Sequence, residues 1–275
     1  MKNKISITIN EKILRDVDGI VDNLYIRNRS QAFEYLIKNA LKEDKVAVIL
    51  VGEGRSNVPK RLKNRYALKI NHLTLIEKAI KKLSDSGFRT IYLIANHNIL
   101  TDIFKIIGNG TDRNIKIEFI NEEKEEGSGQ ALKLLKGKIK TTFLVVQCDI
   151  VFDEVNLLEL WQQHIHDKNI ATISVYSSIT PGNQLLFGYV NLQGNKVISY
   201  VEKPTPRSLR STIFSGGIFV AEPEILNYPG KSLELDIFPE LAKRRLLGGQ
   251  IMNTEHLHIH THEDLVRVRK KISSF

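Results

Sequence analysis

The chain has 275 residues, 42% of them hydrophobic, which is enough for two domains with a large core. Its formal net charge of +9 is compatible with an anionic partner such as DNA or nucleotide phosphates, although charge spread evenly over the surface would give the same value. The single cysteine, Cys148, excludes an intrachain disulfide framework. With no long apolar stretch and no signal-like start, the sequence predicts a cytoplasmic protein without a membrane span.

The first 44 residues predict a strand followed by two helices. Residues 4–9 alternate between polar side chains and isoleucines, which is the period of a half-buried strand. Asn10 is placed to cap a helix over residues 11–23, and Ser30 to cap a second helix whose apolar stripe ends at Leu41. A unit this small buries too little surface to be stable alone, so we expect two copies of the chain to pair.

This β-α-α order, over residues 2–43, resembles the ribbon-helix-helix family of DNA-binding regulators. The resemblance implies a homodimer, with further pairing into tetramers left open, whose two-stranded ribbon lies in the major groove of double-stranded DNA. It also implies that the start of the second helix contacts a phosphate. The DNA-binding residues it implies are Lys4, Ser6, Thr8, Arg29 and Ser30. The alternative is that the strand pairs with a sheet elsewhere in the chain and that its polar face is solvated surface.

From Lys45 onward, strands and helices alternate, which predicts an α/β domain over residues 45–275 with a Rossmann-like, mixed and mostly parallel sheet. The continuous apolar run at residues 46–51 is typical of a strand buried on both faces. In such folds, ligands bind beyond the carboxyl ends of the strands. Further strands are expected at residues 90–95, 115–120, 142–147, 171–177, 187–191, 197–201 and 217–221, with helices over 74–84 and from Gln130.

Several motifs of this second domain follow one another in a fixed order. They occupy residues 48–55, 69–77, 127–132, 144–149, 187–189, 201–204, 215–219 and 232–236. Each motif alone is a weak signal, since a Gly-x-Gly loop is common in turns. As an ordered set, they resemble the sugar-phosphate nucleotidylyltransferases. These enzymes join a nucleoside triphosphate to a sugar 1-phosphate and release pyrophosphate.

The resemblance implies a role for several residues. Catalysis in this family depends on positioning two phosphates and on cations that stabilise their charge, usually with Mg²⁺ held between two aspartates. Asp149 matches one metal ligand, and His258 stands at the position of the other. In an active enzyme, Arg55 and Asp149 would be catalytic. The implied nucleotide-binding residues are Gly52, Gly54, Arg55, Arg65, Gly127, Gly129 and Gln130. The implied sugar-phosphate-binding residues are Gly188, Glu202, Lys203 and Gly217.

Three departures from the family pattern indicate a changed site. Gly54 is followed by Arg-Ser-Asn-Val where the family has Thr-Arg-Leu. The loop after Gly52 is shorter than the family's, which puts Arg65 where the family has a lysine. A planar guanidinium group then replaces the compact ammonium group of lysine. His258 replaces an aspartate, and an imidazole suits Zn²⁺ or another transition metal better than Mg²⁺. The residues implied to bind the nucleotide and the sugar phosphate therefore match the family pattern better than the residues implied in catalysis.

Together, these features predict a DNA-binding transcription regulator whose nucleotidyltransferase-like domain senses a nucleotide or a nucleotide sugar. The alternative is an active sugar-1-phosphate nucleotidylyltransferase that carries an N-terminal DNA-binding or oligomerisation module. In a third interpretation, the N-terminal unit binds a protein partner and neither domain contacts DNA.

The sequence leaves alternative roles open for the late histidines and for Asp149. The histidines at 256, 258, 260 and 262 alternate along an expected strand, so they either form a metal site or are substitutions in an altered motif. Asp149 either binds a metal or caps the following turn. The glutamates between residues 122 and 126 are interpreted as a solvated loop flank.

Overall fold

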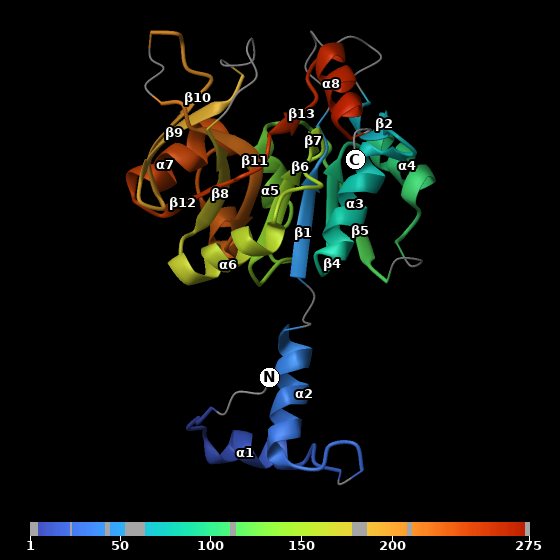
Figure 1. The fold of residues 1–275 in the computed structure, drawn as a ribbon, viewed down its shortest axis with the longest axis vertical. Helices are drawn as coiled ribbons and strands as arrows, with labels where there is room; N and C mark the ends of the chain where they lie inside the picture. Colours follow the sequence, from blue (N-terminus) through green and yellow to red (C-terminus); the bar gives the residue numbers. More distant parts are fainter. Residues whose placement is uncertain are drawn as a thin grey trace. The chain divides into compact units, whose positions relative to one another are not determined.

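The computed structural model describes residues 5–22, 24–41, 45–52, 64–110, 114–177, 186–207 and 211–272 (Figure 1). Contacts divide the chain into two units, Met1–Asp44 and Lys45–Phe275. The first contains helices α1 (Glu11–Asp18) and α2 (Arg29–Leu41). The second contains β1 (Lys45–Leu50), η2 (Arg65–Ala67), β2 (Lys69–Ile70), β3 (Leu73–Thr74), α3 (Leu75–Asp85), β4 (Phe88–Ala95), α4 (His97–Ile107), β5 (Lys116–Asn121), α5 (Ser128–Lys133), β6 (Phe143–Gln147), β7 (Ile150–Val151), α6 (Leu157–Asp167), β8 (Ala171–Tyr176), β9 (Gly188–Gln193), β10 (Lys196–Glu202), β11 (Phe214–Ala221), η4 (Pro223–Asn227), η5 (Leu233–Ile237), α7 (Phe238–Lys243), β12 (Leu247–Ile251), β13 (Leu257–His258) and α8 (His262–Ile272).

The first unit differs from the predicted ribbon-helix-helix arrangement. Asn10 caps α1 as expected, accepting a hydrogen bond of 2.8 Å from the backbone N–H of Lys12. Residues 5–10 form no strand, however, and residues 5–8 are exposed on both of the expected faces. A strand needs hydrogen bonds from a neighbouring strand, and the described part of this unit offers none. The predicted β-α-α order is therefore not supported.

The two helices of the first unit are joined by an ion pair. The guanidinium of Arg29 donates two hydrogen bonds, of 2.6 and 2.8 Å, to the carboxylate of Asp18. Arg29, which the sequence assigned to a DNA phosphate, is thus paired within its own unit. Ser6, Thr8 and Ser30 are exposed, and Lys4 lies outside the described residues.

The second unit is built on a mixed sheet. Its described strands form one nine-stranded sheet in the order β5-β4-β1-β6-β11-β8-β12-β10-β9. Strands β5, β4, β1 and β6 are mutually parallel, as are β8 and β12. Strand β11 is antiparallel to β6 and β8, and β9 and β10 pair antiparallel. The prediction of a mixed sheet is confirmed, but its parallel part is concentrated in the first half rather than dominating the whole.

Both faces of the sheet are covered. Ala47 and Ile49 of β1 pack in one core with helices α3, α4 and α6. Val48 and Leu50, which point the other way, pack in a second core with α5 and α7. This two-sided burial explains why β1 is continuously apolar, as the sequence suggested. No helix among the described residues is long and apolar enough to cross a membrane.

The register of the sheet brings several loops to one edge. Leu50 of β1 is aligned with Ile94 of β4 and with Gln147 of β6, so these parallel strands end side by side (Figure 1). Gly52 and Asp149 follow β1 and β6 at this edge. Strand β13 pairs antiparallel with β7 and places His258 opposite Ile150, which carries the late histidine segment to the same edge.

Candidate active site

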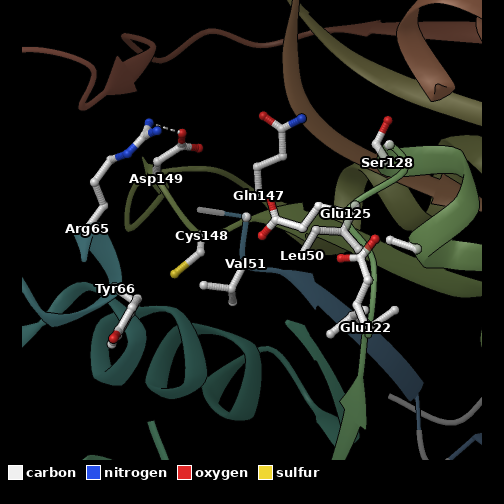
Figure 2. A pocket seen from close by; sticks show the side chains of 14 residues that line it. Leu50, Val51, Arg65, Tyr66, Glu122, Glu125, Ser128, Gln147, Cys148 and Asp149 are labelled. Carbon is white, nitrogen blue, oxygen red and sulfur yellow. Dashed lines mark hydrogen bonds and ion pairs between the residues drawn. The ribbon is translucent and has the colours of Figure 1, made fainter. Parts of the chain in front are cut away.

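A cavity of about 270 Å³ opens at the carboxyl ends of β1, β4 and β6 (Figure 2). Its lining residues are Leu50, Val51, Gly52, Arg65, Tyr66, Ile94, Glu122, Glu125, Gly127, Ser128, Ala131, Gln147, Cys148 and Asp149. Burial raises the pKa of the Cys148 thiol far above its usual range, so the thiol stays protonated and is no candidate nucleophile. The chemistry of this cavity therefore lies with its carboxylates and its arginine.

Asp149 and Arg65 form an ion pair at one end of this cavity. Oδ2 of Asp149 lies 2.5 Å from Nη1 of Arg65, and both side chains are mostly buried (Figure 2). Burial by itself would raise the pKa of Asp149, but His258 and Arg65 beside it hold that pKa well below its usual range. Asp149 is therefore a permanent carboxylate, suited to holding a cation.

Glu122 lines the opposite part of the cavity and is buried, with 8% of its surface exposed. Burial, together with the charge of Glu125, raises the pKa of Glu122 to about 7. The interpretation of this glutamate as part of a solvated flank is therefore wrong, although Glu123 and Glu126 are exposed. The sequence missed it because the glutamates form one continuous polar run, and only the pairing of β5 with β4 turns this one inward.

A second cavity, of about 620 Å³, continues from the first. It is lined by all four residues assigned to the sugar phosphate, namely Gly188, Glu202, Lys203 and Gly217. Lys203 has a backbone φ of 47°, in the left-handed region that a lysine adopts only at a conformational cost. Its amine lies 2.8 Å from Oε1 of Glu202. This turn at the end of β10 places the lysine in the cavity wall.

The wall between the two cavities is held by Glu234 of η5. Ser128 donates a hydrogen bond of 2.6 Å to Oε2 of Glu234, and Gln147 donates one of 3.3 Å to its Oε1. The hydroxyl of Ser232 is a third donor, at 3.0 Å. One carboxylate thus connects α5, the end of β6 and η5. The sequence placed Glu234 in a family motif without a role.

Three histidines line the second cavity beside Asp149. His256 is anchored by a 3.1 Å contact between its Nε2 and the backbone oxygen of Gly216. Nε2 of His258 lies 3.1 Å from Oδ2 of Asp149, and the ring of His260 packs edge-on against that of His258. Burial and the neighbouring His258 lower the pKa of both His256 and His260 to about 3, so these two rings are neutral. Only residues 257–258 of the expected longer strand are in a strand.

The predicted nucleotide-binding residues divide into three groups. Gly52, Arg65 and Gly127 line the first cavity. Gly129 and Gln130 do not line it but pack against the backbone of Lys231, to which Gln130 donates a 2.9 Å hydrogen bond through its N–H. Gly54 and Arg55 lie outside the described residues.

Comparison with known proteins identifies the class of protein. Residues 47–251 match the family described as nucleotidyl transferase, and the chain belongs to that family. Over 206 residues it is 30% identical to the bifunctional protein GlmU of Methanococcus aeolicus, covering 72% of this chain and 45% of that one. It is also 31% identical over 179 residues to GlmU of Methanococcus vannielii, covering 62% and 39% of the two chains. The chain spans less than half the length of these relatives.

Solved structures share the fold. A structure named as a glucose-1-phosphate thymidylyltransferase from Bacillus anthracis superposes with a TM-score of 0.73 at 21% identity, covering 84% of this chain and 96% of the other. A UDP-glucose pyrophosphorylase bound to UDP-glucose gives a TM-score of 0.68 at 14% identity, covering 84% and 99%. The family is described as nucleotidyl transferase, and the two structures are named as a thymidylyltransferase and a pyrophosphorylase. The prediction of a DNA-binding transcription regulator is therefore wrong, and double-stranded DNA is not a supported partner.

The family implies Mg²⁺, but the residues beside Asp149 do not suit this ion. Mg²⁺ prefers oxygen ligands in octahedral geometry. Here the groups nearest to the carboxylate are the imidazole of His258 and the guanidinium of Arg65. An arginine cannot ligate a metal, and an imidazole nitrogen favours transition metals. A magnesium site made of two carboxylates is therefore absent from this part of the described chain.

Proposed function

We propose that the chain is a sugar-1-phosphate nucleotidylyltransferase, which transfers the nucleotidyl group of a nucleoside triphosphate to a sugar 1-phosphate. The observation that carries this proposal is that the two cavities share one wall. The residues that line both are Arg65, Gly127, Ser128, Gln147 and Asp149. Two substrates bound in the two cavities would have their phosphates side by side at this wall, which is the arrangement that a transfer reaction needs.

The reaction is a displacement at phosphorus. A phosphate oxygen of the sugar 1-phosphate forms a bond to the α-phosphorus, and the bond from that phosphorus to the bridging oxygen breaks. Pyrophosphate leaves with the electron pair, and nothing is oxidised or reduced. Negative charge gathers on both phosphates during this step. Among the described residues, Arg65 and Lys203 are the arginine and lysine side chains that line the cavities and can stabilise that charge.

The first cavity is the better site for the nucleotide. Gly52 follows β1 at its rim, and a Cβ added there would meet no atom of the described residues within 4 Å. The rim beside Gly52 is therefore open toward the described part of the chain, and a backbone without a side chain allows a phosphate to approach closely. The larger second cavity, with Glu202 and Lys203, is the better site for the sugar phosphate, because it offers a carboxylate for hydroxyl groups beside a cation for the phosphate.

The test is pyrophosphate release by the untagged chain, assayed with each nucleoside triphosphate against a set of hexose 1-phosphates and with several divalent ions. We expect turnover with at least one pair and a loss of about 100-fold or more in kcat for Asp149→Asn. The matched control is His166→Ala, because this histidine is exposed and outside both cavities. Absence of turnover with every pair, together with no shift in melting temperature on adding nucleotides, would overturn the proposal.

A further inference from the structure

Asp149, His258 and His260 bring three metal-ligating atoms together at the wall between the two cavities. One atom from each side chain lies within 4.8 Å of the other two. Ligands at about 2.1 Å from a first-row transition metal are at most about 4.2 Å apart. Shifts of the three ligand atoms by less than about 1 Å would therefore bring them to coordination distance from one ion. Loops from two distant parts of the sequence meet here, because β13 pairs with β7.

His258 is buried beside Asp149, and the hydrogen-bonding capacity of its ring is not fully used. Its side chain is 8% exposed, and its Nε2 lies 3.1 Å from Oδ2 of Asp149, within ion-pair distance. Neither ring nitrogen has a hydrogen bond of good geometry among the described residues. A buried imidazole nitrogen without a well-formed hydrogen bond is costly. An ion held between the carboxylate and the ring would occupy the nitrogen that faces Asp149.

We propose that Asp149, His258 and His260 bind a transition-metal ion of the Zn²⁺, Co²⁺ or Mn²⁺ type in preference to Mg²⁺. Two imidazoles and one carboxylate are a ligand set typical of such ions, whereas Mg²⁺ prefers oxygen alone. Three protein ligands leave coordination positions open. The importance of those positions rests on the function proposed above, since they would face phosphate oxygens at the shared wall.

Arg65 is compatible with such an ion. A carboxylate can accept several interactions through its two oxygens, so Asp149 can bind the ion while keeping its pair with Arg65. Nη1 of Arg65 also donates a hydrogen bond of 3.4 Å to the backbone oxygen of Ile259, between the two histidine ligands. The guanidinium therefore fixes the carboxylate and the histidine segment relative to each other, as outer partners of metal ligands do.

The experiment is a Co²⁺ titration of the untagged chain, followed by visible absorption. It is repeated with a roughly 100-fold excess of Mg²⁺. We expect one ion per chain, with ligand-field bands that the excess Mg²⁺ does not remove. His258→Ala and His260→Ala should each weaken binding by about tenfold or more, and His166→Ala should leave it unchanged. His258→Asp, which restores a second carboxylate, should shift the preference toward Mg²⁺.

Two results would overturn the inference: no Co²⁺ binding by the folded chain, or binding that is unaffected by both alanine variants, which would locate it elsewhere. Circular dichroism of each variant separates a lost ligand from a lost fold. The outcomes are independent of the proposed function. Binding without pyrophosphate release would leave the metal site standing and remove the transferase, and turnover without Co²⁺ binding would do the reverse.

Discussion

The hydroxyl of Ser128 donates a hydrogen bond of 2.6 Å to Oε2 of Glu234, although the two residues are 106 positions apart in the sequence. The same hydroxyl accepts a 2.9 Å hydrogen bond from the backbone N–H of Leu233. The start of α5 and the η5 segment are thereby locked together. Because Ser128 lines both cavities, this link sets the position of their common wall.

We therefore expect Glu234→Ala to impair both substrates at once. Removing the carboxylate frees Ser128 and Gln147, so the KM values for the nucleotide and for the sugar phosphate should each rise by about tenfold, with a loss of roughly 1–2 kcal/mol in stability. Steady-state kinetics and urea unfolding measure the two effects. Glu224→Ala, at an exposed glutamate of η4, is the control. A change in only one KM would show that Glu234 does not position the shared wall.

The raised pKa of Glu122 makes stability depend on pH. This carboxyl keeps its proton in the folded chain up to about pH 7, whereas the unfolded chain loses it near the usual value of 4.5. A group whose folded pKa is raised stabilises the fold at low pH and loses that contribution as pH rises through the folded pKa. Relative to Glu122→Gln, the native chain should therefore lose stability between about pH 4.5 and pH 7, by about 1–2 kcal/mol after allowance for solvent at the cavity mouth.

The measurement for Glu122 is the free energy of unfolding in urea, at several pH values across this interval, for both chains. Glu123→Gln provides the control, since Glu123 is its exposed neighbour and should give a difference that does not vary with pH. If the difference between the native chain and Glu122→Gln is also flat, Glu122 is not buried as described.

Two substitutions of Lys203 separate its effect on binding of the sugar 1-phosphate from the backbone strain at this residue. Lys203→Gly removes the cation and also relieves the positive φ, so the KM for the sugar 1-phosphate should rise at least about tenfold while stability stays equal or increases by about 0.5–1 kcal/mol. Lys203→Ala should impair the KM equally without the gain in stability. Arg245→Gly, at an exposed residue with φ of 59°, should show the stability effect alone. An unchanged KM in Lys203→Gly would contradict a role for the amine.

The first unit is the part of the chain from which the sequence predicts a homodimer. Of its described apolar side chains, Val17 and Ala32 are buried, while several others are exposed, including Ile5, Ile7 and Tyr25. Such a unit gains little from its own core. We expect deletion of residues 1–44 to convert a dimer into a monomer by light scattering, with the melting temperature of the remaining unit nearly unchanged. An identical mass before and after deletion would rule out dimerisation through this segment.

Much of the second unit could be predicted from the sequence, because its signals are local. The apolar run of β1 required a strand buried on both faces, and β8, predicted at residues 171–177, spans Ala171–Tyr176. The Gly127 loop and Lys203 were found through motifs, and both line cavities. The prediction of a strand in the first unit was wrong for a related reason. Alternation in residues 4–9 indicates that a strand could form, but a strand also needs a neighbour, which periodicity does not supply.

Hydrophobic periodicity and motif order are properties of neighbouring positions, so the fold class of the second unit and the residues that end its strands could be read from the chain alone. Which of these residues meet depends on the three-dimensional arrangement of the strands. Asp149 joins Arg65 across 84 positions and faces His258 because β13 pairs with β7. Glu122 is buried because β5 lies beside β4. Contacts of this kind depend on the order and register of strands, and the burial and charge that result set the pKa values and the ligand chemistry of the site.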